Sequence, residues 1–361
     1  MSIKSSMDIF KSNIKRRSAR VVRIGKLYIG GKYPIAIQSM TKTITKNIDQ
    51  TIEQIQRLTR AGAEIVRVAV NDHKDAQALS EIKRQIDIPL VADIHFDWTL
   101  AIEAIEAGVD KIRLNPGNIF RKAEIREICA AAKLAGIPIR VGLNSGSIGK
   151  TKNRGYALVQ KAKEYLKIIE GFGFRNLVVS VKAENIFETV AAYQQIAEIC
   201  DYPLHLGVTA TGTYQKGLAK SYVAMGILLF QGIGDTLRIS LTEQPEKEIE
   251  AARALLEAMG LRRFSPQIIS CPTCGRSRVP LIKMVKRLEQ QLKEQKLSKN
   301  ALSSTVAMMG CVVNGPGEAS CADIGLAFGK TQGLLFKKGK PLYKVLAKDA
   351  VFSLIRELTR L

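Results

Sequence analysis

Short apolar segments alternate with amphipathic ones over roughly the first two-thirds of the chain. Most of the apolar segments are rich in Val, Ile and Leu, as strands buried on both faces are; they begin at Ile35, Ile65, Leu90, Lys111, Ile139, Leu177, Leu204 and Thr236. Between them, segments such as 51–61, 99–107 and 125–135 carry apolar residues at helical spacing, and a glycine that can end a helix follows each of these three. Eight strand–helix cycles predict an α/β fold, a closed (β/α)8 barrel of the TIM type. A doubly wound open sheet is the alternative, but its glycine-rich nucleotide-binding loop does not follow the first strand.

The alternation stops near residue 260 and a different pattern follows. A helix is predicted over 279–295, strands over 305–309, 324–328 and 334–337, and a closing helix over 350–361. We therefore expect two domains: a barrel over residues 1–260 and a small α+β domain over 261–361.

The composition is that of a globular protein with an excess of positive charge. Lys and Arg number 55 against 33 acids, so the net charge is +22 in a chain of 361 residues. Such an excess favours anionic partners, namely phosphorylated metabolites, an acidic redox protein or nucleic acid, although lysines spread over solvated faces explain it equally well. No recognised nucleic-acid-binding module is present, so nucleic acid is the least favoured partner. No run approaches the ~20 apolar residues of a membrane span and no apolar signal core begins the chain, so we expect a cytoplasmic protein without a membrane partner.

Polar residues gather toward the ends of the predicted barrel strands. They are Gln38, Arg67, Asp93, His95, Arg113, Asn115, Arg140, Asn144, Lys182, Arg238 and Ser240. Barrel enzymes place their active sites at this rim, and five cations together with Asn and Ser donors suit a doubly phosphorylated anion. For any single arginine, an ion pair that closes the end of a strand is an equally good interpretation. Lys182 is the strongest single indication of an anion site, because a lysine in a buried strand must pair with an anion or shift its pKa.

Cysteines in the second domain indicate a metal site. Cys271 and Cys274 form a Cys-x-x-Cys pair, and Cys311 and Cys321 follow. Thiolates so spaced select zinc or an iron–sulfur cluster over hard ions, and spacing alone proposes all four as ligands without choosing between the two. The three histidines precede Cys271 by more than sixty residues, so finger-type Cys/His spacing is absent. Cys129 and Cys200 lie in predicted helices and are expected to be ordinary buried thiols.

Six phrases, PIAIQSMTKT, LVADIHFD, KIRLNPGNI, GIGDTLRISL, CPTCGR and GCVVNGPGEA, occur in order between about Arg17 and Gly329. Together they resemble the 4-hydroxy-3-methylbut-2-en-1-yl diphosphate synthase family of the non-mevalonate isoprenoid pathway, in its compact bacterial two-domain form. The resemblance implies that two electrons open the ring of 2-C-methyl-D-erythritol 2,4-cyclodiphosphate and that a hydroxyl leaves as water. It also implies one [4Fe–4S] cluster held by Cys271, Cys274, Cys311 and Glu318, with Cys321 as a non-ligand. A carboxylate is more readily displaced than a thiolate, so Glu318 belongs with the catalytic residues.

The same resemblance implies the roles of the rim residues and of the partners. Substrate contacts are expected from Arg67, Arg113, Asn115, Arg140, Asn144, Lys182, Arg238 and Ser240, with Asp93 and His95 as catalytic residues in the same pocket. The family is homodimeric, one subunit's cluster domain covering the other's barrel, and a reduced ferredoxin or flavodoxin supplies the electrons.

Two positions depart from the family pattern: Ala210 replaces an expected glutamate, and Gln231 replaces an acid. A diverged or weakened homologue that binds phosphorylated ligands is therefore an alternative. A zinc-stabilised basic binding protein is a further one.

Overall fold

The computed structural model describes every residue except 1–13, 150, 152, 210, 312–318 and 331. The chain divides into two compact units, and the division falls between Arg262 and Arg263. This point is two residues from the division proposed from the sequence pattern.

The larger unit is built around eight parallel strands. They are β3 (Ala36–Met40), β4 (Ile65–Val70), β5 (Leu90–Ile94), β6 (Lys111–Leu114), β7 (Ile139–Asn144), β8 (Leu177–Lys182), β9 (His205–Leu206) and β10 (Thr236–Leu237). Their order in the sheet is β8-β7-β6-β5-β4-β3-β10-β9. A parallel bridge between Val179 and Leu204 joins the two ends of the sheet. The predicted barrel is therefore confirmed.

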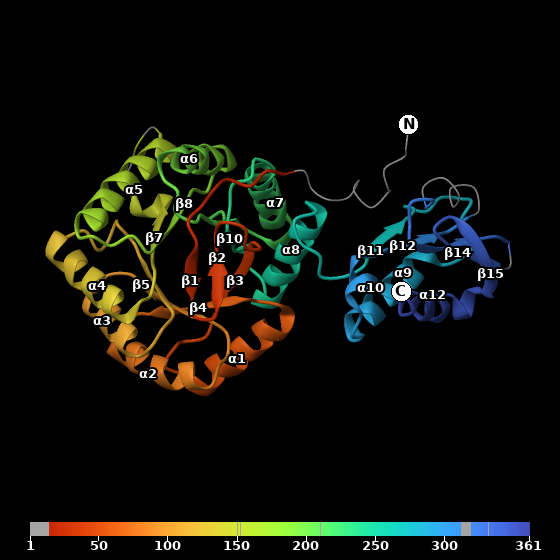
Figure 1. Ribbon diagram of the computed structural model, residues 1–361, viewed down its shortest axis with the longest axis horizontal. Helices are drawn as coiled ribbons and strands as arrows, with labels where there is room; N and C mark the ends of the chain where they lie inside the picture. The colour runs from red at the N-terminus through yellow and green to blue at the C-terminus, as the bar shows by residue number, and fades with distance from the viewer. Residues whose placement is uncertain (1–13, 150, 152, 210, 312–318, 331) are drawn as a thin grey trace. The chain divides into compact units, whose positions relative to one another are not determined.

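Helices cover the outside of the barrel as a ring (Figure 1). They are α1 (Ile48–Ala61), α2 (His73–Arg84), α3 (Thr99–Glu106), α4 (Lys122–Ala135), α5 (Arg154–Gly171), α6 (Ile186–Ile199), α7 (Tyr214–Phe230) and α8 (Pro245–Ala258), with a short 3₁₀ turn, η1 (Ser145–Ser147), after β7. Each helix buries one apolar stripe; in α1 it contains Ile52, Ile55 and Leu58. Gly62 ends α1 with φ +106°, a left-handed conformation that favours glycine.

A hairpin closes the end of the barrel at which the strands begin. Strands β1 (Val22–Ile24) and β2 (Leu27–Ile29) pair antiparallel. Their side chains pack on Ala36, Ile65, Val91 and Val178, which are first or second residues of barrel strands. This apolar floor leaves the other end of the barrel for polar chemistry.

The smaller unit is a five-stranded mixed sheet with helices. Its sheet order is β11 (Gln267–Ser270), β12 (Thr305–Met309), β13 (Ile324–Phe328), β14 (Gln332–Lys337) and β15 (Lys340–Leu346); the first three strands are parallel and the last two join antiparallel. Helices α9 (Leu281–Glu294), α10 (Lys299–Ser303) and α12 (Ala350–Leu358), with the 3₁₀ turn η2 (Ala347–Asp349), complete it. Residues of α9 and α12 such as Leu288 and Leu354 form its core with Val306, Leu326 and Leu335 of the sheet. The predicted α+β character is confirmed.

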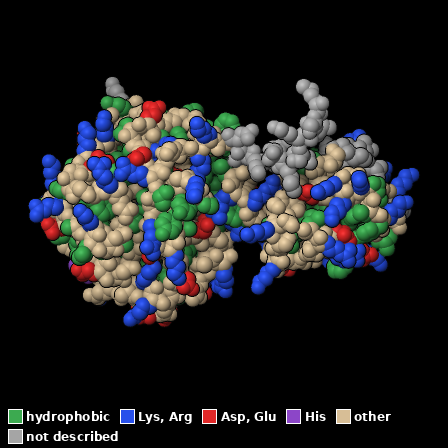
Figure 2. All heavy atoms as spheres, in the orientation of Figure 1, with side chains coloured by type: hydrophobic (Ala, Val, Ile, Leu, Met, Phe, Trp, Pro, Cys, Tyr) green, Lys and Arg blue, Asp and Glu red, His purple; other side chains and the backbone are tan. Residues whose placement is uncertain are grey.

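Basic side chains are dispersed over the visible face of each unit, with single acids between them (Figure 2). Within the described part of the chain, no helix is long and apolar enough to cross a membrane.

Candidate active site

The residues predicted to line a site face the barrel interior, most of them where strands end. Asn144 and Lys182 are the last residues of β7 and β8; Asp93 and Arg113 lie one residue before the ends of β5 and β6; His95, Asn115, Arg238 and Ser240 follow strands directly or within three residues. Gln38, Arg67 and Arg140 are the exceptions, since they lie at the third positions of β3 and β4 and the second of β7. The guanidinium of Arg67 nevertheless reaches Asp93 near the end of β5 and the sulfur of Met40 at the end of β3.

Asp93 is the centre of this constellation. Its Oδ1 accepts a hydrogen bond from Arg113 Nη1 at 3.0 Å, and its Oδ2 lies 3.6 Å from Arg67 Nε and 3.4 Å from His95 Nε2. Burial alone would raise the pKa of this carboxyl, but the charge of Arg67, the hydrogen bond with His95 and the charge of Arg113 hold it well below its usual value. Asp93 is thus an ionised carboxylate that neutralises part of the positive charge around it.

The remaining positive charge is buried with too few counterions. Arg140 is 1% exposed, and its Nε and Nη1 have no hydrogen-bond partner among the described residues; the same holds for Nε of Arg113. Burial, and then the charges of the neighbouring arginines, lower the pKa of Lys182 well below its usual value. Burial, and then the charges of Arg67 and Arg113, also lower the pKa of Arg140, but a guanidinium is not deprotonated in proteins and keeps its charge. Unpaired buried cations are costly, so an anion bound among these residues would offset part of that cost.

Arg238 is held by a carboxylate that sequence reasoning did not single out. Glu248, on α8 and 2% exposed, accepts from Nε and Nη2 of Arg238 at 3.3 and 3.2 Å and from the backbone N–H of Leu241 at 3.0 Å. A signal was present, since Glu248 falls on the buried stripe of α8 that also contains Ile249 and Ala252.

Two further polar residues lie inside the barrel, below the rim. Lys111 is fully buried with Nζ 3.4 Å from Oε1 of Gln38, and His205 is fully buried with Nδ1 2.9 Å from Oγ1 of Thr236. Burial lowers the pKa of both Lys111 and His205 well below their usual values. Strand alternation could have found Lys111, because it is two residues before Arg113 and faces the same side.

The amide and hydroxyl residues of the rim are placed by local structure. The side chain of Asn115 accepts the N–H of Gly117 at 3.1 Å and so fixes the turn after β6. The carbonyl of Ser240 accepts from the hydroxyl of Thr211, which links the loop after β9 to the loop after β10. Asn144 ends β7 and is half-buried.

Cys271 and Cys311 lie where two parallel strands of the smaller unit's sheet end. Cys271 directly follows β11 and Cys311 comes two residues after β12, and these neighbouring strands are parallel. The N–H of Gly310 points at Sγ of Cys271 from 3.4 Å. A backbone hydrogen bond from Arg276, and the charge of its side chain, lower the pKa of the exposed Cys274 thiol. The amide donor at Cys271 and the lowered pKa of Cys274 favour thiolates at these two residues, which therefore fit a soft metal or an iron–sulfur cluster.

Glu318 and Cys321 are the two candidates for the fourth ligand of the metal site. Glu318 lies outside the described residues. Cys321 is described and exposed; it precedes β13, and the N–H of Asp323 binds the carbonyl of Thr305 at the start of β12. Cys321 therefore lies at the end of the sheet where the parallel strands begin, opposite to Cys271 and Cys311. This position favours a ligand set without Cys321 over the set of four cysteines. No group of three or more His, Cys, Asp or Glu with metal-binding geometry occurs within the described ranges.

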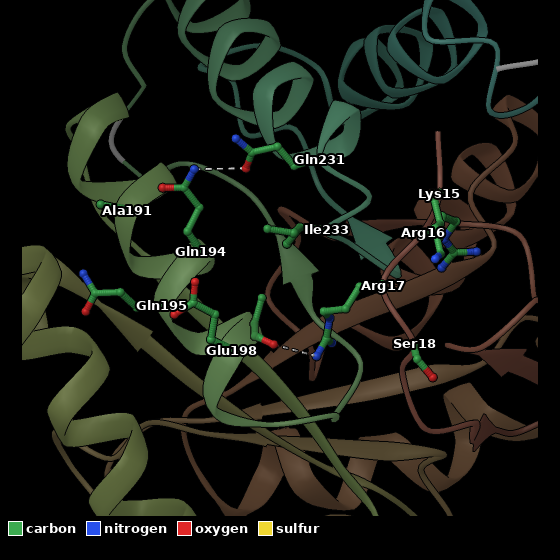
Figure 3. Close-up of a pocket in the computed structure, with 11 residues that line it drawn as sticks. Lys15, Arg16, Arg17, Ser18, Ala191, Gln194, Gln195, Glu198, Gln231 and Ile233 are labelled. Carbon is green, nitrogen blue, oxygen red and sulfur yellow. Dashed lines mark hydrogen bonds between the residues drawn. The ribbon is translucent and has the colours of Figure 1, made fainter. Parts of the chain in front are cut away.

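Of the two positions that depart from the family pattern, the structure describes one. Ala210 lies outside the described residues. Gln231 caps the end of α7, and its side-chain oxygen accepts from Gln194 Nε2 at 3.0 Å (Figure 3). Lys15, Arg16 and Arg17 line the same hollow. This is the end of the barrel at which the strands begin, so Gln231 lies away from the rim that carries the cationic residues.

Comparison with known proteins identifies the family to which the chain belongs. The GcpE TIM-barrel domain matches residues 19–253 and the GcpE protein C-terminal domain matches residues 267–360. A protein of Caldicellulosiruptor saccharolyticus is 50% identical over 343 residues, which are 93% of this chain and 97% of the relative. One of Caldanaerobacter subterraneus subsp. tengcongensis is 46% identical over 353 residues, 96% of this chain and 98% of the relative. Both bear the name 4-hydroxy-3-methylbut-2-en-1-yl diphosphate synthase (flavodoxin).

Solved structures show the barrel alone. The dihydropteroate synthase of Yersinia pestis superposes with a TM-score of 0.51 at 14% identity and covers 67% of this chain and 99% of that one. At this identity the likeness concerns the fold. The family models, by contrast, match both units in order, and the resemblance found in the sequence is confirmed: the chain belongs to the GcpE family.

Proposed function

We propose that this chain is an oxidoreductase that converts 2-C-methyl-D-erythritol 2,4-cyclodiphosphate to 4-hydroxy-3-methylbut-2-en-1-yl diphosphate. Two electrons and two protons enter, a ring C–O bond breaks, and a hydroxyl leaves as water. The observation that carries the proposal is the barrel interior, where Arg113, Arg140 and Lys182 are buried and the two arginines keep donors unpaired among the described residues. The relatives named above are synthases of this diphosphate.

The substrate's two phosphates would bind where the positive charge is concentrated. Arg140 and Lys182 offer the least neutralised charge, and a diphosphate between them would raise the pKa of the Lys182 ammonium again. Arg67, Arg113 and Arg238 add forked donors, while Asn115, Asn144 and Ser240 supply neutral hydrogen bonds to the sugar-derived hydroxyls. Binding thus offsets the electrostatic cost of the buried cations.

Asp93 and His95 would act next to the reacting carbons. Asp93 stays ionised and orients Arg67 and Arg113. His95 lies at the mouth of the barrel, its side chain 41% exposed, with Nε2 3.4 Å from Asp93 Oδ2 and 3.2 Å from Arg113 Nη1. An imidazole in this position can deliver a proton to the departing hydroxyl, a role in which general acids contribute about 10²–10⁴-fold.

The cofactor we propose is a [4Fe–4S] cluster held by Cys271, Cys274, Cys311 and Glu318. The described cysteines fit it, because Cys271 accepts an amide N–H and the pKa of Cys274 is lowered. When bound, such a cluster supplies single electrons and a Lewis-acidic iron. A flavodoxin, named for the relatives, is the proposed donor, with ferredoxin as the other candidate. We also propose a homodimer.

The experiment that tests this function is anaerobic conversion. Purified protein is reconstituted with iron and sulfide, reduced chemically and given the cyclodiphosphate, and the product is identified by mass. Formation of the allylic diphosphate is expected. A brown protein that binds the cyclodiphosphate without turnover would instead indicate a diverged homologue, and a colourless zinc protein would exclude both.

A further inference from the structure

Two inward-facing positions in the barrel carry glycine. Each lies next to a strand that carries a long cationic side chain, Arg113 in one case and Lys182 in the other. Gly142 lies in β7 between the inward-facing Arg140 and Asn144, and Gly207 follows β9, two residues after His205. Neither glycine has φ in the left-handed region. Backbone conformation therefore does not require glycine at either position, in contrast to Gly62.

The space that a side chain would take at Gly207 is filled by Lys182. A Cβ at Gly207 would lie 2.6 Å from Nζ and 3.0 Å from Cε of Lys182, and 2.9 Å from the carbonyl oxygen of Arg238. Real Cβ atoms essentially never approach other atoms so closely. The ammonium could move away, but the carbonyl belongs to the barrel wall and cannot.

The space that a side chain would take at Gly142 is filled in the same way by Arg113. A Cβ there would lie 2.6 Å from Nε of Arg113 and 3.2 Å from Oγ of Ser180. Nη2 of Arg113 donates to the carbonyl of Gly142 at 2.7 Å, and Nη1 donates to Asp93 at 3.0 Å. The guanidinium thus lies against the backbone of Gly142, and a methyl group there would push it away from both partners.

We propose that Gly142 and Gly207 are positioning residues, whose missing side chains let Arg113 and Lys182 lie against the barrel wall and so set where a diphosphate binds. The inference rests on the proposed function, because it concerns the binding of that substrate. Any Cβ at either position moves a cationic group toward the centre of the barrel, into space that the anion needs.

The test is calorimetric titration of cluster-free protein with the cyclodiphosphate, for wild type, Gly207→Ala and Gly142→Ala. Each variant is expected to bind about 10- to 100-fold more weakly, the equivalent of one lost charge-assisted hydrogen bond. In the cluster-loaded enzyme the same variants should raise KM with little change in kcat. Gly226→Ala is the matched control, since a methyl group there meets nothing within 4 Å, and it should bind like wild type.

A double-mutant cycle separates positioning from general damage to the barrel. When Gly207→Ala is combined with Lys182→Met, which removes Nζ, the glycine substitution should cost clearly less affinity than it does in wild type, and the remaining cost comes from the carbonyl of Arg238. Wild-type affinity in both glycine variants would overturn the inference, as would an undiminished effect of Gly207→Ala in the protein that already carries Lys182→Met. Should Gly207→Ala fail to fold, Gly142→Ala decides by the same criterion. If wild type itself does not bind the cyclodiphosphate, the barrel site of the proposed function is wrong and the inference falls with it.

Discussion

Replacing Asp93 with Asn removes a carboxylate that Arg67, Arg113 and His95 share, while its shape is kept. Asp93 and Arg113 have side chains that are each 3% exposed, and Nη1 of Arg113 lies 3.0 Å from Oδ1. Arg67 approaches the other oxygen to 3.6 Å. The variant therefore leaves buried guanidinium groups without the anion that neutralises them.

Removing one member of a buried ion pair costs about 3–5 kcal/mol, because the other charge is left uncompensated. A unit of this size loses about 2–4 °C in unfolding midpoint per kcal/mol. The barrel of Asp93→Asn should therefore unfold about 6–20 °C below wild type. The cyclodiphosphate brings negative charge to the same arginines, so it should recover part of this loss.

Thermal unfolding followed by circular dichroism, with and without the cyclodiphosphate, measures both effects. Asp72→Asn is the control, since Asp72 and Lys46 form an exposed ion pair with side chains 45% and 42% exposed. Such pairs contribute about 0–1 kcal/mol, and Asn can still cap α2. An Asp93→Asn midpoint as close to wild type as that of Asp72→Asn would refute the claim that Asp93 neutralises buried charge.

Three further outcomes are expected. The pKa of Asp93 is lowered in the folded state, so the stabilisation by its carboxylate is present above the unfolded pKa of about 3.9 and is lost below it. The difference in unfolding midpoint between wild type and Asp93→Asn should therefore hold down to about pH 5 and narrow below about pH 4. A difference that already narrows near neutral pH would contradict this. Glu248→Gln keeps the acceptor for Leu241 but weakens the hold on Arg238, so steady-state kinetics should show KM raised about 10-fold, and an unchanged KM would exclude the positioning role. Cys274→Ser should lose most of the iron bound after reconstitution whereas Cys321→Ser should keep it, as iron and sulfide analysis would show; equal losses would restore the four-cysteine set.

Much of the barrel could be predicted because each strand is a buried, branched-residue run and each helix an amphipathic one. In the smaller unit, the predicted strands 305–309 and 324–328 coincide with β12 and β13. Strand β15 was missed because it is an exposed edge strand without alternation, and β1 and β2 because each has three residues.

The site was predictable only where strand alternation reveals which side chains face inward. Lys111 obeys that alternation and was overlooked at the start of its strand. Glu248 could not be paired with Arg238 by pattern, since an acid-rich first helical turn is typical of exposed helix starts. Gln231 looked relevant because it precedes a characteristic phrase, yet a helix of a (β/α) barrel ends at the face opposite the active site.

In the function that we propose, the positive charge buried in the barrel binds a diphosphate. The most direct measurement is titration of cluster-free wild-type protein with the cyclodiphosphate, beside the same titration with its phosphate-free polyol and with the Arg140→Met variant. We expect saturable binding of one cyclodiphosphate per chain, no binding of the polyol, and a loss of about 10-fold or more in affinity for the variant. Absence of cyclodiphosphate binding, or equal binding by wild type and Arg140→Met, would contradict it.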